Sequence, residues 1–161
     1  HTTLFNRFGS KQGLMLAALG APKDIHWIGT LEAGPDHRPI REQIVEIACT
    51  IAAFFEDLHA GFTVLQASGI PTEALCSGED PEESAPARAF RALTEWIGRA
   101  QDQKKLAQCD AQVLASTLLG VLHNRAFSNR ICGEPGSDKA TDERHVADVI
   151  TLLWDGIRPV P

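Results

Sequence analysis

Hydrophobic residues recur at three- and four-residue intervals along most of the chain, a spacing typical of helices with one apolar face. The clearest stripe follows Pro39 and consists of Ile40, Ile44, Ile47, Ile51, Phe54, Phe55 and Leu58. Because proline is favoured in the first turn of a helix, this stripe predicts a central core helix of about five turns that starts at Pro39. The alternating β-branched runs and tight turns that indicate strands do not occur in the sequence. The pattern therefore predicts an all-α fold.

Further helices are expected between segments rich in glycine and proline. They cover the ranges 24–31, 62–69, 87–106, 110–129 and 142–157. Asp110 is well placed to cap the fourth of these helices, because its carboxylate can accept hydrogen bonds from the free N–H groups of the first turn.

The last two predicted helices, 110–129 and 142–157, carry apolar residues around more of their circumference than one packing face requires. A monomer rarely exposes a large contiguous apolar patch, so this surplus predicts a homodimer in which both subunits use the same surface. The expected interface residues are Ala115, Leu118, Leu119, Leu122, Val146, Val149, Ile150, Leu153 and Trp154.

Composition and charge narrow the class of protein. A chain of 161 residues is long enough for one well-buried domain. The balance of 15 Lys and Arg against 21 Asp and Glu gives a net charge of −6, so most of the chain is not expected to bind nucleic acid. The four cysteines form no close pair, and no apolar run reaches the roughly 20 residues that a membrane span needs. These features predict a cytoplasmic protein without a membrane partner.

The first residues include Leu4-Phe5-Asn6-Arg7-Phe8, followed by Lys11-Gln12-Gly13-Leu14. This stretch resembles the end of the DNA-binding domain of tetracycline-repressor (TetR) type regulators, where a recognition helix closes with Leu-Tyr-x-His-Phe and a turn presents Lys-Glu-x-Leu. Phe5, Arg7 and Gln12 depart from that pattern. The stretch from Leu106 to Gly120 also resembles the family, in which an Asp opens the helix that forms the dimer contact.

The resemblance implies an organisation and a function. Residues 1–19 would be the end of a helix-turn-helix domain and its linking helix, and residues 20–161 an effector-binding and dimerisation domain. Two further helices and a turn are expected ahead of His1 in a complete regulator. The protein would be a homodimeric repressor that leaves its operator DNA when a small apolar effector binds, with no cofactor.

DNA contacts are expected from five residues of the first segment: Thr2, Thr3, Asn6, Arg7 and Lys11. Lys11 would begin a helix, where its charge adds to the positive end of the helix dipole and favours a phosphate. Base contacts specify a sequence while phosphate contacts only position the protein, so Asn6 and Arg7 are the candidates for sequence preference. The break at Gly20 and Pro22 would be a hinge towards the effector domain.

An effector cavity is expected between the central helices, because such cavities in helical bundles are mostly apolar with a few polar anchors. Its candidate residues are Trp27, Phe54, Phe55, Leu58, Phe62, Phe90, Leu93, Trp96, His123 and Phe127. Aromatic residues at helical spacing also serve as plain core, and His123 fits either a core histidine or a group that contacts the ligand. The histidines lack metal-ligand spacing, so no metal is predicted.

Two other classes of protein compete with this interpretation. An enzyme is disfavoured because the sequence has no Gly-rich phosphate loop, no G-x-S-x-G and no H-E-x-x-H. A helical dimeric module that binds a small molecule but not DNA is disfavoured only by the match from Leu4 to Leu16.

Overall fold

The computed structural model of the protein describes residues 27–67, 69, 84–132 and 139–157. It contains helices α3 (Ile28–Ala33), α4 (Ile40–Ala67), α5 (Ala85–Asp102), α6 (Ala111–Cys132) and α7 (Lys139–Ile157). None of the described residues lies in a strand, and the predicted all-α fold is confirmed. None of the helices described is both long and apolar enough to cross a membrane.

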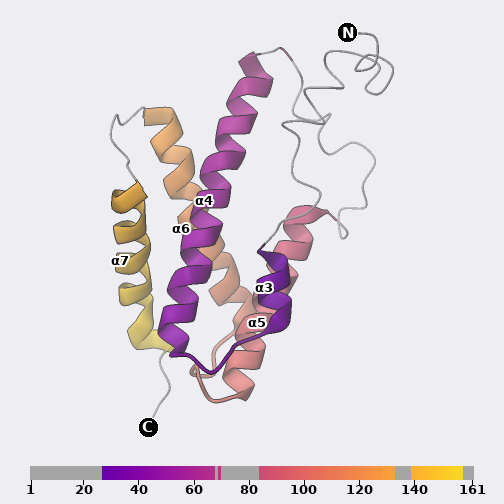
Figure 1. The fold of residues 1–161 in the computed structure, drawn as a ribbon, viewed down its shortest axis with the longest axis vertical. Coiled ribbons are helices and arrows are strands. Elements are labelled where there is room, and N and C mark those ends of the chain that lie inside the picture. Colours follow the sequence, from indigo (N-terminus) through magenta and orange to yellow (C-terminus); the bar gives the residue numbers. More distant parts are fainter. Residues whose placement is uncertain (1–26, 68, 70–83, 133–138, 158–161) are drawn as a thin grey trace.

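Helix α4 is the central element of the bundle (Figure 1). It packs against α6 and against α7, while α5 packs against α3 and α6. Arg41, in the first turn of α4, donates a 2.8 Å hydrogen bond to the Thr151 hydroxyl of α7, and its guanidinium lies 5.8 Å from the centre of the Trp154 ring. The start of α4 is thus fixed to α7 by polar and by cation–π contacts.

The predicted break after Leu58 is wrong, because α4 continues to Ala67 and includes the segment assigned to a separate helix. Gly61 is the only glycine in this stretch, and an isolated glycine costs a helix only about 1 kcal/mol. Contacts to the helix offset that cost. The Thr63 hydroxyl donates to the His59 carbonyl at 2.9 Å and accepts a 2.9 Å bond from Arg130 Nε of α6.

The starts of α5 and α6 follow local capping chemistry. Ser84 caps α5 by accepting from the backbone N–H of Ala87, and a proline stands in the first turn. Asp110 Oδ1 accepts hydrogen bonds from Gln112 N at 2.9 Å and Val113 N at 3.1 Å, which confirms the predicted cap of α6. Helix α5 ends at Asp102, four residues earlier than expected, and α6 continues past Asn129 to Cys132.

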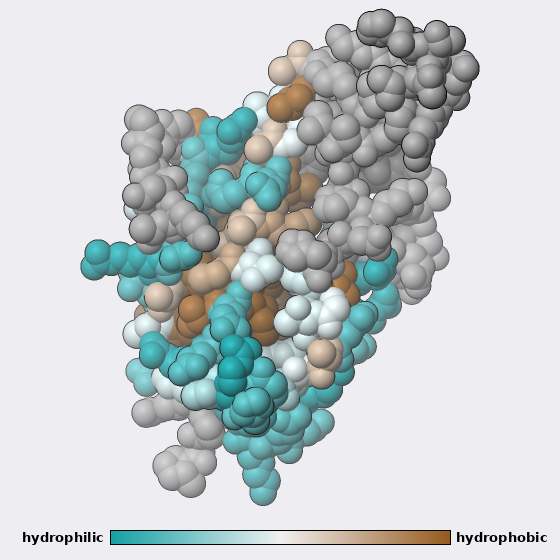
Figure 2. Space-filling view, in the orientation of Figure 1, coloured by the Kyte–Doolittle hydropathy of each residue, from teal (hydrophilic) through white to brown (hydrophobic). Residues whose placement is uncertain are grey.

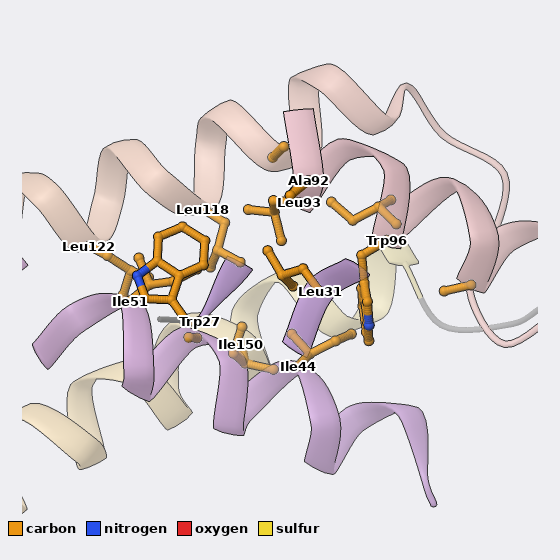
Figure 3. Packing of buried hydrophobic residues seen from close by; sticks show 14 of the residues in the cluster. Trp27, Leu31, Ile44, Ile51, Ala92, Leu93, Trp96, Leu118, Leu122 and Ile150 are labelled. Atoms are coloured by element: carbon orange, nitrogen blue, oxygen red, sulfur yellow. The ribbon is translucent and has the colours of Figure 1, made fainter. Parts of the chain in front are cut away.

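All five described helices contribute residues to one hydrophobic core (Figure 3). Ile44 and Ile51 from the predicted stripe are buried, and so is Ala48 between them; Ala48 and Ile51 are buried completely. Leu93 from α5 and Ile150 from α7 meet them, each 1% exposed. Figure 2 shows that hydrophilic residues gather at the lower end of the visible face, while hydrophobic residues reach the surface along its middle.

Two buried glutamines hold the connecting loops. Gln43 of α4 accepts a bond from Asp36 N at 2.9 Å and donates to the Arg38 carbonyl at 2.8 Å. Gln101 of α5 donates through Nε2 to the carbonyls of Ala107 and Cys109, both at 2.9 Å. In these loops the backbone N–H and C=O groups have no helical hydrogen-bond partners. Each glutamine side chain therefore supplies hydrogen bonds to such groups.

We predict that Gln101→Ala lowers the free energy of unfolding by about 1–3 kcal/mol, because the loop carbonyls lose their buried donor. Urea denaturation of the full-length protein measures this change. Gln112→Ala, at an exposed position of α6, is the matched control and should change stability by less than about 0.5 kcal/mol. Equal effects of the two substitutions would contradict the role of Gln101.

Candidate functional site

Six ring-bearing side chains from the start of α3, from α4 and from α6 form a continuous series that we call the aromatic row. They are Trp27, Phe54, Phe55, His59, His123 and Phe127. At the inner end, the rings of Trp27 and Phe54 meet edge to face with centroids 6.0 Å apart. Phe54 and Phe55 follow at 5.7 Å. These separations lie in the range of attractive aromatic contacts.

The outer end of the row consists of side chains one helical turn apart on two helices. The ring of Phe55 meets His123 edge to face at 5.2 Å. His59, one turn after Phe55, lies 4.9 Å from His123 and 5.8 Å from Phe127. His123 and Phe127 stack at 6.4 Å with nearly parallel planes. The row thus crosses the contact between α4 and α6.

Exposure increases along the row. Trp27 is 4% exposed, Phe54 and Phe55 are half-buried, and Phe127 is 46% exposed. His123 is also exposed. The row therefore runs from the surface to the interior as a series of contacts between rings.

A polar atom stands at the inner end of the row. The Nε1 atom of Trp27 is buried and has no hydrogen-bond partner among the residues that the structure describes. Buried indole N–H groups usually find an acceptor, and an unsatisfied one costs free energy. Trp27 is held in place because it precedes Ile28 and Leu31 of α3, which are 5% and 0% exposed. Its N–H is thus a donor at a fixed position.

At the outer end of the row, the surroundings lower the pKa of His59. Burial lowers its pKa, and the neighbouring His123 and Arg130 lower it further, while Glu56 acts in the opposite direction. Glu56 is itself tied to α6, because its Oε1 accepts a 3.0 Å bond from Asn129. The neutral imidazole of His59 is therefore favoured in the folded protein. No group of three His, Cys, Asp or Glu side chains suited to a metal occurs in the part of the chain that the structure describes.

Two of the other predicted effector residues, Leu93 and Trp96, line a different part of the core. Leu93 and Trp96 are buried and line a cavity of about 20 Å³ between α4, α5, α6 and α7. That volume holds roughly one water molecule and no larger effector. Phe90 and Leu58 are half-buried, and the side chain of Phe62 is not among those described. His59 was not a predicted site residue, although its position four residues after Phe55 places both on one helix face.

The predicted dimer residues fall into two groups. One group is buried in the core of the single chain: Ala115, Leu118, Leu122, Val146 and Ile150. The other group is half-buried: Leu119, Val149, Leu153 and Trp154. The large apolar side chains that α6 and α7 expose are different ones, namely Val113, Phe127, Ile131 and Leu152.

The five predicted DNA contacts, Thr2, Thr3, Asn6, Arg7 and Lys11, lie outside the described residues, as does the predicted hinge at Gly20 and Pro22. Their roles stay predictions.

The lowered pKa of His59 predicts a pH dependence of stability. Below the ordinary histidine pKa of 6.5 the unfolded chain takes up a proton that folded His59 resists, so stability falls as the pH falls through this range. His59→Gln should therefore reduce the loss of stability between about pH 7.5 and about pH 5.5, measured by urea denaturation. His37→Gln, at an exposed loop position, is the control. An unchanged loss in the His59 variant would contradict the assignment.

A comparison with known protein families matches the C-terminal part of the chain. Residues 78–155 match the family model described as AefR-like transcriptional repressor, C-terminal domain. The match includes α5, α6 and most of α7, and with them His123 and Phe127 of the aromatic row. No curated protein matches the sequence. Residues 78–155 therefore form the effector-binding domain of a TetR-type transcription regulator.

Proposed function

We propose that this protein is a homodimeric repressor that binds operator DNA through an N-terminal domain ending near residue 19, and leaves it when a small apolar effector binds within residues 20–161. The aromatic row carries the proposal. It runs from the surface, at His123 and Phe127, to Trp27 at the start of α3, and its rings are of the kind that line apolar effector sites in helical bundles. Trp27 is also the described residue nearest in sequence to the proposed DNA-binding segment.

Contacts between α3 and α5 support a route from the effector to the DNA-binding segment. The Arg99 guanidinium of α5 donates from Nη2 to the Leu31 carbonyl in the last turn of α3. Lys105 donates through Nζ to the carbonyl of Asp36 in the following loop. The C-terminal end of α3 is thus fixed to α5, while an effector next to Trp27 would act on its N-terminal end. Such a ligand shifts the equilibrium only as far as its affinities for the two states differ.

We further propose that a second copy of the chain covers one face of α6, which we call the α6 stripe. It consists of the exposed residues Val113, Thr117, Gly120, Asn124, Phe127 and Ile131. Their spacing of four and three residues places them on a single face over five turns. A methyl group added at Gly120 would meet no atom of the same chain within 4 Å. The stripe has apolar side chains at its two ends and Gly120 near its middle. A second helix can approach closely at such a small residue.

Operator binding by the full-length protein, with and without a panel of neutral aromatic compounds, tests the function. Retention of the operator in the absence of effector and release in its presence support the proposal. A dimer that binds such compounds but has no affinity for DNA would instead identify a small-molecule-binding module.

The proposed role of Lys11 predicts that Lys11→Ala in the full-length protein weakens binding to all DNA sequences about equally. The dependence of affinity on salt should fall by about one phosphate contact. Filter binding across a salt series measures both effects. Arg91→Ala on α5, an exposed cation of the effector domain, is the control and should leave both unchanged. A loss of affinity restricted to one base position would refute the phosphate contact.

The α6 stripe predicts opposite effects of one substitution on folding and on dimerisation. Gly120→Ala should favour the helix by about 1 kcal/mol, yet weaken the dimer by about 1–3 kcal/mol because a methyl group enters a close contact. Gly98→Ala on α5, where an added Cβ also meets no atom within 4 Å, is the matched control and should affect only stability. Sedimentation equilibrium gives the dimer dissociation constant.

Ile131→Lys provides a second variant, since Ile131 is 66% exposed in the single chain. It should yield folded monomers. If both Gly120→Ala and Ile131→Lys dimerise like the wild type, the second copy does not bind the α6 stripe.

A further inference from the structure

The buried indole N–H of Trp27 bears on the chemistry of the effector. Residues next to Trp27 in the core offer no acceptor: Phe54 meets its ring, and Ile51, Leu118 and Leu122 belong to the same cluster. Figure 3 shows the indole at the end of the core where Ile51 and Leu122 lie, with its nitrogen turned towards their side. Among the described residues, the donor therefore faces hydrocarbon side chains, where an unmet hydrogen bond costs most.

A ligand that brings an acceptor to this atom would recover that cost. We propose that the effector is an uncharged, mainly aromatic molecule with an exposed acceptor oxygen, such as an aryl carbonyl compound, and that this oxygen accepts a hydrogen bond from Trp27 Nε1. The rest of the molecule lies along Phe54 and Phe55 towards His123. The inference rests on the proposed function, since it assumes that the aromatic row is the effector site.

Two observations favour an uncharged ligand. Within the described residues, the partners that Trp27 and Phe54 contact in the row are rings without charge, so a carboxylate at Trp27 would be buried without a cation. Burial also favours the neutral form of His59 at the outer end. A charge at the buried end of the ligand would thus be lost from water without compensation.

The inner end also limits the number of polar groups on the ligand. Trp27 offers one N–H and no acceptor, because an indole nitrogen is a donor only. A second polar group on the buried end of the ligand would be left without a partner. One acceptor oxygen at the buried end, with apolar groups behind it, matches what the row supplies.

Indole N–H signals in a ¹H–¹⁵N correlation spectrum of the full-length protein test the proposal. The chain has three tryptophans, and Trp27→Phe assigns the signal of Trp27. The probes are acetophenone and ethylbenzene, which have similar shapes and differ in the carbonyl oxygen. Acetophenone should move the Trp27 signal downfield and bind about two- to tenfold more tightly than ethylbenzene, the factor expected of one buried hydrogen bond.

Trp27→Phe keeps an aromatic ring at this position but removes the N–H, so it should bind both probes equally. Benzoate should bind more weakly than acetophenone to the wild type. The proposal is overturned if acetophenone leaves the Trp27 signal in place up to its solubility limit, or if the wild type does not discriminate between the two neutral probes. The wild-type spectra alone decide the question should Trp27→Phe fail to fold.

These outcomes are separate from the test of operator release. A downfield shift of the Trp27 signal with unchanged DNA binding would support the ligand chemistry and reject release from the operator. Release of the operator by acetophenone, with no change in the Trp27 signal, would support release from the operator and reject the ligand chemistry.

Discussion

The packing of α4 against both α6 and α7 is the constraint on which the rest of the structure depends. In its first half, α4 presents Ile44, Ala48 and Ile51, which are buried because small and branched side chains fit closely between helices. One turn later, Phe54 and Phe55 are half-buried. One continuous helix therefore supplies the core at its start and the aromatic row beyond it.

Sequence patterns predicted the features that depend on local chemistry. The apolar stripe of α4 and the Asp110 cap of α6 follow from spacing and from unpaired backbone groups, and both are found. The division of α6 between core and surface could not be predicted in the same way. Its apolar residues occupy most of the circumference, so only the positions of α4 and α5 decide that Leu118 is buried and Val113 exposed. The unmet N–H of Trp27 likewise depends on which side chains surround it in three dimensions.

Phe127 belongs to both the aromatic row and the α6 stripe. Its ring stacks on His123 in the aromatic row, and its position in the α6 stripe turns part of the same side chain outward. A second copy on that stripe would therefore cover the outer end of the row. Effector binding and subunit contact would then both involve Phe127. The two events would be coupled directly through this side chain, and not through a series of other residues.

The two ends of α3 differ in what holds them. At its C-terminal end the guanidinium of Arg99 meets the Leu31 carbonyl, a charge-assisted bond at the negative end of the helix. Gly34 follows with φ +83°, a backbone conformation that favours glycine. At the N-terminal end, Trp27 has apolar contacts and an unmet donor. An effector that binds at Trp27 would therefore act on the end of α3 that leads to the segment proposed to bind DNA.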